Sequence, residues 1–102
     1  MQEEIKNKTD ELKKLCSIFR VKRLYIFGSA TNNNFNADSD VDLLISFEDD
    51  LSVEEYTNNF FALHEKLSSL FVRSIDLVTE RTLSNPYFIE SVNKTKQLIY
   101  EA

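Results

Sequence analysis

The chain has 102 residues with one Gly, one Pro, one Cys and no Trp, and 42% of its residues are hydrophobic. This composition is ordinary for a globular domain, and the lone Cys16 excludes a disulfide-rich secreted module. No apolar run approaches the length of a membrane span, and the N-terminal segment MQEEIKNKTDELKK lacks the apolar core of a signal peptide. A single domain over residues 1–102, located in the cytoplasm and not in a membrane, is therefore expected.

The net charge of −5 is unevenly distributed. Residues 38–55 carry eight acidic side chains and no basic one, whereas residues 1–23 carry seven basic and four acidic side chains. A broad basic surface is absent, so direct nucleic-acid binding is not expected. Solvent, a metal ion or a basic partner must balance the acidic block.

The first half of the chain is expected to form a helix followed by two strands. Apolar residues recur at helical spacing from about Gln2 to Phe19, with Lys and Glu between them. Val21–Phe27 is rich in β-branched and aromatic residues, which favour a strand, and the only glycine of the chain follows it. After a polar stretch that fits a loop or one helical turn, Val41–Phe47 alternates in the manner of a second strand.

The second half is expected to begin with a helix that runs to about Leu70. Ser52 and Glu55 have the S-x-x-E spacing of a capping box in front of it. Val72–Val78 then reads as a third strand, and Asp76 is the one acid inside this otherwise apolar segment.

A last helix is expected to open at residues 85–86, where Asn serves as the N-cap and Pro occupies the first helical position. Its apolar stripe is predicted to include Ile89, Val92 and either Leu98 or Ile99. The resulting order, α-β-(short α)-β-α-β-α, predicts an α/β (α+β) fold in which helices flank a small mixed β-sheet.

Three features of the sequence point to chemistry. Gly28-Ser29 directly follows a strand, where a small residue lets the backbone approach a ligand and free N–H groups of a helical turn favour a phosphate. Asp40 and Asp42 are two residues apart, so on a strand they point the same way and repel each other. Asp76 is expected to be buried, which is costly for a carboxylate without a partner.

All three features are explained if the strands are neighbours and the three carboxylates hold Mg²⁺. Oxygen-only ligands select a hard cation, and Mg²⁺ prefers a few carboxylates together with substrate phosphates. Two such ions stabilise the attacking and leaving oxygens of an in-line displacement at phosphorus. The constellation therefore indicates nucleotidyl transfer.

Each feature also has an ordinary structural explanation. Gly28-Ser29 fits a simple turn, and the paired acids fit a solvated edge strand. Asp76 fits an ion pair with Arg73 or Arg81. A calcium-binding EF-hand loop starting at Asp38 does not fit, because its sixth position is Leu43 instead of Gly. The combination of the three features, and no single one, favours the catalytic interpretation.

A family resemblance supports that interpretation. Gly28-Ser29, then ten residues, then Asp40-x-Asp42 resembles the GS-x10-DxD signature of the polymerase β-like nucleotidyltransferases. The surrounding RLYIFGSATNNNFNADSDVDLLISF is similar to the minimal nucleotidyltransferase (MNT) group, and the third family carboxylate falls on Asp76 in SIDLV. The ending NPYFIESVNKTKQLIYEA is also similar to that of these short proteins, so the resemblance covers nearly the whole chain.

The resemblance implies a polymerase β-like fold and a role for each site residue. Gly28 and Ser29 would contact the nucleotide triphosphate. Asp40 and Asp42 would bind metal, and Asp76 would complete the metal site and help to deprotonate the acceptor hydroxyl. The implied cofactor is Mg²⁺, as two ions, and the implied substrate is ATP.

The resemblance also implies a partner. Many members are the antitoxin of a HEPN–MNT pair, and such a member transfers AMP from ATP to a tyrosine of its HEPN toxin, a ribonuclease, which silences the toxin. Larger relatives that modify antibiotics or RNA carry an added acceptor domain, for which this chain has no room. The acceptor is therefore expected to be another protein held at an interface, and self-association into a homo-oligomer is compatible with this expectation.

The chain departs from the family pattern just after the glycine. Many members have Arg or Lys three positions after the Ser, often followed by Gly, where this sequence has Asn32 and Asn33. Asn33 tolerates left-handed backbone geometry and is expected to replace the Gly, whereas Asn32 brings no positive charge to a phosphate. Two alternatives therefore stay open: a binding module that neutralises its partner by occlusion without catalysis, and a nucleotidyltransferase for a small molecule.

Overall fold

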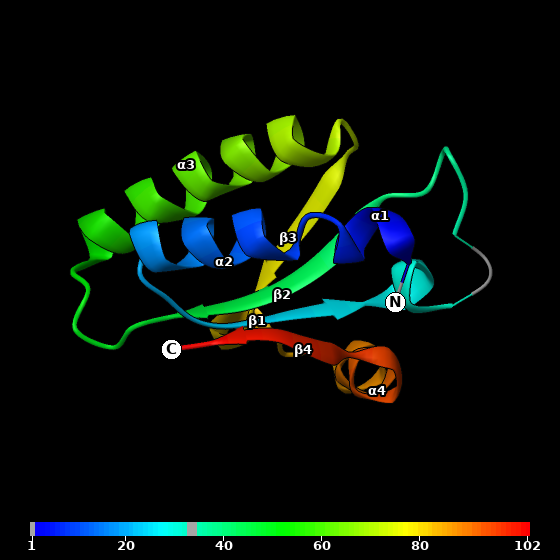
Figure 1. Ribbon diagram of the computed structural model, residues 1–102. Helices are drawn as coiled ribbons and strands as arrows, with labels where there is room; N and C mark the ends of the chain where they lie inside the picture. Colours follow the sequence, from blue (N-terminus) through cyan, green and yellow to red (C-terminus); the bar gives the residue numbers. More distant parts are fainter. Residues whose placement is uncertain (1, 33–34) are drawn as a thin grey trace.

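A four-stranded mixed sheet forms the centre of the computed structural model, which describes residues 2–32 and 35–102 (Figure 1). The strand order is β3-β2-β1-β4. β1 pairs antiparallel with both β2 and β4, and β2 pairs parallel with β3. The strands span Val21–Phe27 (β1), Val41–Phe47 (β2), Ile75–Thr79 (β3) and Gln97–Glu101 (β4).

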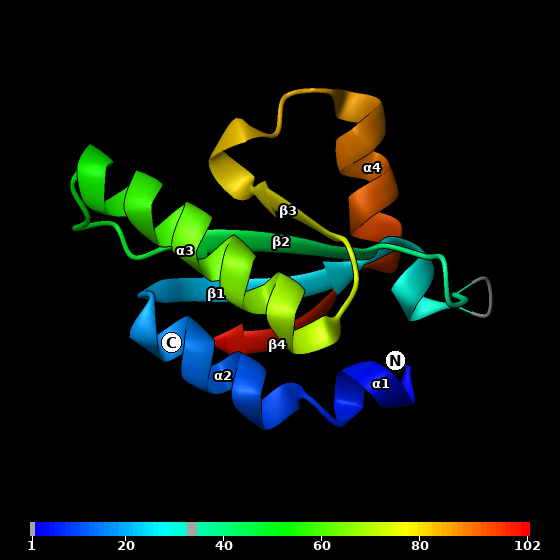
Figure 2. The same cartoon turned by 90° about the horizontal axis from the view of Figure 1, so that it is seen from above.

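Helices cover both faces of this sheet. Figure 1 shows α1, α2 and α3 on one face and α4 on the other, and Figure 2 shows α3 crossing above the strands. Two short 3-10 helices, η1 and η2, follow β1 and β3. The helices span Glu3–Lys6 (α1), Thr9–Ile18 (α2), Gly28–Thr31 (η1), Val53–Phe71 (α3), Glu80–Thr82 (η2) and Pro86–Thr95 (α4). The predicted α/β architecture with a small mixed sheet is confirmed.

The alternation of side chains along β2 divides the core into two layers. Val41, Leu43 and Ile45 are fully buried in the larger cluster, beneath the helices of the first face. Leu44 points to the opposite face, where it packs with Phe27 and α4. Asp42 shares the face of Leu44, because residues two apart on a strand point the same way.

Both helix starts that were predicted from capping residues are present. The Ser52 side chain accepts a hydrogen bond from the Glu55 N–H, and the Glu55 carboxylate accepts one from the Ser52 N–H, which completes the capping box of α3. The Asn85 side chain accepts hydrogen bonds from the N–H groups of Tyr87 and Phe88 at the start of α4.

The N-terminal segment forms two helices where one was expected. A turn at residues 7–8 separates α1 from α2. The predicted apolar stripe is still buried, since Ile5, Leu12 and Cys16 all lie in the core. The periodicity survives the break because each short helix presents its apolar positions to the same sheet.

The C-terminal segment was wrongly predicted to be helical to its end. α4 ends at Thr95, Lys96 has extended backbone angles (φ −61°, ψ 138°), and residues 97–101 form β4. Leu98 and Ile99 therefore belong to an edge strand that pairs with β1. Long-range strand pairing decides this segment, and the local spacing of apolar residues does not reveal it.

The third strand begins later than expected. Val72 ends α3 in the left-handed conformation (φ 52°) and is 88% exposed, so β3 starts only at Ile75. Asn33, which was expected to replace a family glycine, lies outside the described residues. No helix among the described residues is long and apolar enough to cross a membrane.

Candidate active site

The end of β1 brings the glycine against the second aspartate. Phe27 pairs with Asp42 across the antiparallel ladder, and Gly28 then turns the chain into η1 with φ +72°. A Cβ placed on Gly28 would lie 2.5 Å from Oδ2 of Asp42. Only a residue without a side chain lets the backbone and this carboxylate approach so closely.

Asp42 and Asp76 lie side by side on neighbouring parallel strands. The two residues are partners in the β2–β3 register, so their Cα atoms are separated by about 4.8 Å. Asp40 precedes Asp42 by two residues, just before β2, and is near enough for its charge to act on Asp42. Asp42 is half-buried, whereas Asp40 and Asp76 are exposed, which corrects the expectation that Asp76 is buried in its strand.

The electrostatics of the three carboxylates act on the middle one. Burial, followed by the negative charges of Asp76 and Asp40, raises the pKa of Asp42 to about 6. Each of these contributions disfavours the ionised form of Asp42. A cation at this end of the sheet would relieve the repulsion among the three groups.

The carboxylate oxygens of the three aspartates suit a hard cation, although the side chains do not surround a metal position. Within residues 2–32 and 35–102, no three His, Cys, Asp or Glu side chains are grouped closely enough to hold a metal ion. Asp40, Asp42 and Asp76 nevertheless supply only oxygen, and Mg²⁺ commonly takes one or two protein carboxylates and completes its coordination with water and substrate phosphates. These residues therefore fit Mg²⁺ that arrives with a nucleotide.

A hydrogen bond from Gly28 ties η1 to α4. The Gly28 N–H donates to Thr95 Oγ1 at 2.9 Å, and Thr31 Oγ1 donates to the Gly28 carbonyl at 2.7 Å. The N–H of Gly28 is therefore engaged within the fold and is not free to bind a ligand. Thr95 is 67 residues away in the chain, and no local pattern marks it as part of this site.

Arg73 holds the loop that leads into the aspartates. Its guanidinium donates to the backbone carbonyls of Asn36 and Ser39, each at 2.8 Å, and it forms an ion pair with Glu4 of α1. Ser39 directly precedes Asp40, so Arg73 fixes the position of the first aspartate. The ordinary explanation of Asp76 as an ion-pair partner of Arg73 is not supported, since Arg73 pairs with Glu4.

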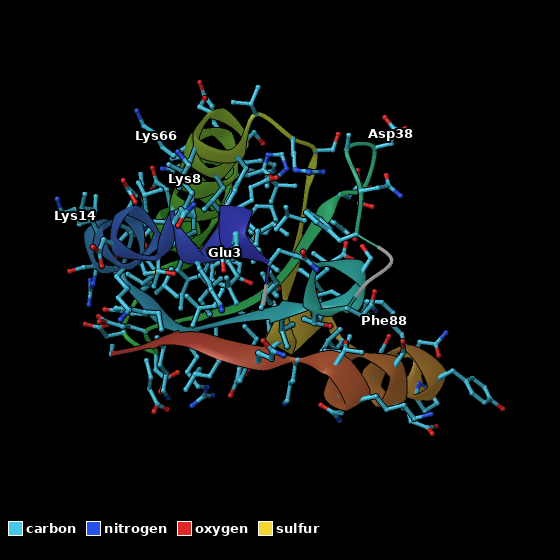
Figure 3. The ribbon with its side chains drawn as sticks, turned by 45° about the vertical axis from the view of Figure 1, so that its right-hand side comes forward. Glu3, Lys8, Lys14, Asp38, Lys66 and Phe88 are labelled. Carbon is cyan, nitrogen blue, oxygen red and sulfur yellow. The ribbon has the colours of Figure 1, made fainter. Side chains whose placement is uncertain are left out.

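One charged and one aromatic residue, Asp38 and Phe88, lie at the surface near this site. Figure 3 places Asp38 on the loop before β2, with its side chain directed away from the sheet, and Phe88 on α4. Phe88 packs edge-on against Phe27, with ring centroids 6.0 Å apart, and stays 39% exposed. An aromatic surface therefore lies beside the strand end that carries Gly28.

Comparison with known proteins identifies the family of this chain. The model of the nucleotidyltransferase domain matches residues 9–99. The Methanocaldococcus jannaschii protein named "Putative protein adenylyltransferase MJ0126" is 33% identical over 88 residues, which cover 86% of this chain and 84% of that protein.

Solved structures agree with this match. A "putative minimal nucleotidyltransferase" superposes with a TM-score of 0.68 at 27% identity, covering 93% of this chain and 92% of that one. An MNT antitoxin in complex with a tri-AMPylated HEPN toxin of Shewanella oneidensis superposes with a TM-score of 0.65 at 20% identity, covering 95% of this chain and 72% of that one. The chain belongs to the nucleotidyltransferase domain family and has the fold of the minimal nucleotidyltransferases.

Proposed function

We propose that this nucleotidyltransferase transfers AMP from ATP to a hydroxyl of a partner protein, and that the partner is a HEPN-type toxin that the transfer silences. The similarity to a protein named as an adenylyltransferase supports the reaction. The likeness in fold to an MNT antitoxin bound to an AMPylated HEPN toxin supports the partner.

The observation that carries the proposal is the register of Asp42 with Asp76 beside Gly28. Parallel pairing aligns the two carboxylates, and the close approach of Gly28 to Asp42 places the β1–η1 turn over them. Ser29 follows Gly28 in that turn, and we propose that it contacts the triphosphate. A strand-ending turn with no catalytic role would not require a glycine packed against a carboxylate, least of all one whose ionised form is disfavoured by its surroundings.

The reaction is an in-line displacement at the α-phosphorus. The acceptor oxygen bonds to this phosphorus while the bond to the bridging oxygen of the β-phosphate breaks, and pyrophosphate leaves. Asp76 is exposed on β3, an edge strand of the sheet, and would take the proton of the approaching hydroxyl. Asp42 and Asp40 would hold the metal, which would supply positive charge next to the triphosphate.

Asp40, Asp42 and Asp76 would hold Mg²⁺, which we propose binds as two ions. When bound, Mg²⁺ offsets the negative charge of the triphosphate and of the leaving pyrophosphate. Gly28 and Ser29 keep the backbone close to the phosphates, and Arg73 keeps the loop before Asp40 in place.

A binding module without catalysis is the second candidate, and Asn32 is the observation in its favour. Asn32 is exposed at the end of η1, at the position where many family members carry a cation. A chain that binds ATP weakly could neutralise its partner by covering it. The two candidates differ in whether neutralisation survives the loss of Asp42.

The test uses ATP labelled on the α-phosphate or on the γ-phosphate, with Mg²⁺ and the purified small helical protein encoded next to this chain. AMP transfer labels the partner from α-labelled ATP only, whereas a kinase would label it from γ-labelled ATP. We expect Asp42→Asn to abolish labelling and the exposed-loop control Asp38→Asn to retain it. An unlabelled partner that is still neutralised by Asp42→Asn would establish the occluding module instead.

A further inference from the structure

Thr95, the last residue of α4, holds the amide of Gly28. Figures 1 and 2 show η1 and the end of α4 side by side where β1 ends. The N–H of Gly28 donates a hydrogen bond to Thr95 Oγ1 at 2.9 Å. This bond joins residues that are 67 positions apart in the sequence, so it ties the proposed nucleotide site to a distant part of the chain.

The hydroxyl of Thr95 continues the hydrogen bonding between β1 and β4. The last backbone pair of this antiparallel ladder is Ile26 with Gln97. Two residues beyond that pair, the same register sets Gly28 opposite Thr95. β4 does not extend to this position, because Thr95 still belongs to α4. A side-chain oxygen therefore accepts the N–H that a backbone carbonyl accepts within a sheet.

The side chain of Thr95 serves this contact and not its own helix. A threonine inside a helix commonly bonds to the carbonyl four residues earlier, which here is that of Ser91. Within the described ranges 2–32 and 35–102, no hydrogen bond joins Thr95 to Ser91, and the bond with Gly28 is the only one that the Thr95 hydroxyl makes. The hydroxyl thus acts on the turn at the end of β1.

The position of Gly28 makes a fixed turn important. Glycine has more backbone freedom than any other residue, and this one lies so close to Asp42 that a Cβ would be 2.5 Å from Oδ2. The Gly28 carbonyl accepts a hydrogen bond from Thr31 Oγ1 at 2.7 Å, but Thr31 belongs to η1 and moves with it. Thr95 lies in another element, so its bond fixes the turn relative to α4 and β4.

We propose that Thr95 is a positioning residue for the nucleotide. By accepting the Gly28 N–H, it keeps the Gly28-Ser29 turn against Asp42, where the triphosphate and its metal would bind. Thr95 acts through Gly28 and does not itself touch the substrate. Without the hydroxyl, the Gly28 N–H loses its acceptor, and the turn moves to find another. The inference rests on the proposed function, because it depends on the binding of the triphosphate by this turn.

Calorimetric titration with Mg²⁺ and a non-hydrolysable ATP analogue measures this role without a partner protein. Thr95→Val keeps the shape of the side chain but removes the hydroxyl, and should weaken binding of the analogue at least about tenfold, because the turn is displaced. Thr95→Ser keeps the hydroxyl and should bind like the wild type. Thr57→Val, the same substitution at an exposed residue of α3, is the matched control and should also bind like the wild type.

The single glycine of the chain gives a direct measurement of the hydrogen bond. Labelling with ¹⁵N-glycine produces one backbone amide signal in the NMR spectrum, that of Gly28, because the chain has no other glycine. This amide should exchange with water faster in Thr95→Val than in the wild type, Thr95→Ser and Thr57→Val. The circular dichroism of the four proteins should agree, since the Thr95 hydroxyl makes no bond within α4.

The outcomes for Thr95 and for AMP transfer are distinguishable. The role of Thr95 is overturned if Thr95→Val binds the analogue like the wild type, if Thr95→Ser binds as weakly as Thr95→Val, or if the Gly28 amide exchanges equally in all variants. A wild-type chain that binds the analogue in the expected way but transfers no AMP would refute the proposed function and leave the role of Thr95 in place. A wild-type chain that binds no analogue would overturn both.

Discussion

The backbone of Gly28 rests against the carboxylate of Asp42. A Cβ at residue 28 would approach Asp42 Oδ2 to 2.5 Å, and the φ of +72° is one that residues with side chains rarely adopt. The only glycine of the chain thus occupies the one place where β1 must end over the aspartates. This contact links the local backbone to the chemistry that we propose for Asp42.

Gly28→Ala is expected to destabilise the fold by about 1–3 kcal/mol and to reduce AMP transfer by more than about tenfold, because both the backbone angle and the contact with Asp42 are violated. Chemical denaturation and the transfer assay measure the two effects. In the double variant Gly28→Ala/Asp42→Ala, the carboxylate oxygen that would clash with the new Cβ is gone. Gly28→Ala should therefore cost less stability in the Asp42→Ala background than in the wild type. An equal cost in both backgrounds would contradict the contact.

Asp42→Asn is expected to stabilise the metal-free protein in a pH-dependent way. The pKa of Asp42 is raised from 3.8 in the unfolded chain to about 6, so folding favours the protonated carboxyl and stability falls as the pH rises through this window. In EDTA the variant should be more stable than the wild type by about 1–3 kcal/mol above pH 6, and equal to it below about pH 4.

Urea denaturation at several pH values measures this difference. Asp38→Asn is the matched control, because Asp38 is exposed on the loop and makes no comparable contact with Asp42. A stability difference between Asp42→Asn and the wild type that is constant from pH 4 to about pH 7 would refute the electrostatic account. With Mg²⁺ and a non-hydrolysable ATP analogue, the wild type should gain stability and the variant should not.

Arg73→Gln is expected to lower transfer by about tenfold while the chain stays folded, because the loop before Asp40 loses its two carbonyl anchors. Circular dichroism and the transfer rate at saturating ATP measure the two properties. Glu4→Gln is the control, since it removes the ion pair with Arg73 but leaves these two hydrogen bonds in place. If Glu4→Gln lowers transfer as much as Arg73→Gln does, the anchoring of the loop is not the cause.

The Glu4–Arg73 pair itself predicts a pH dependence of stability. Arg73 holds the pKa of Glu4 below its usual value, mainly through their hydrogen bond. The pair therefore contributes stability above the ordinary glutamate pKa and loses it as the pH falls through the lowered one. Glu4→Gln should unfold more easily than the wild type at neutral pH by less than about 1 kcal/mol, and equally once the pH is below the lowered pKa of Glu4. A difference that persists in acid would exclude the ion pair as its source.

Much of the fold was predictable because its signals are local. The bounds of β1 and β2 follow from β-branched and alternating residues, and the start of α3 follows from the Ser52–Glu55 capping box. β4 was not predictable, since Leu98 and Ile99 continue the helical spacing of α4 and only their pairing with β1 makes them a strand.

The site shows the same division between local and distant signals. Gly28-Ser29 and Asp40-x-Asp42 are visible as a motif, whereas the register that sets Asp76 beside Asp42 depends on how two strands pair. Arg73 and Thr95 reach the site across 34 and 67 residues of sequence, through hydrogen bonds that no spacing rule describes. The exposure of Asp76 follows from the short β3, at the edge of the sheet.

The most direct measurement of the central claim is the intact mass of the partner. The chain is co-expressed with the product of the adjacent gene, as wild type, as Asp40→Asn/Asp42→Asn and as the Asp38→Asn control. We predict that the partner gains the mass of one or more AMP groups with the wild type and the control, and none with the double variant. An unmodified partner in a stable complex with the wild-type chain would contradict AMP transfer and leave occlusion as the function.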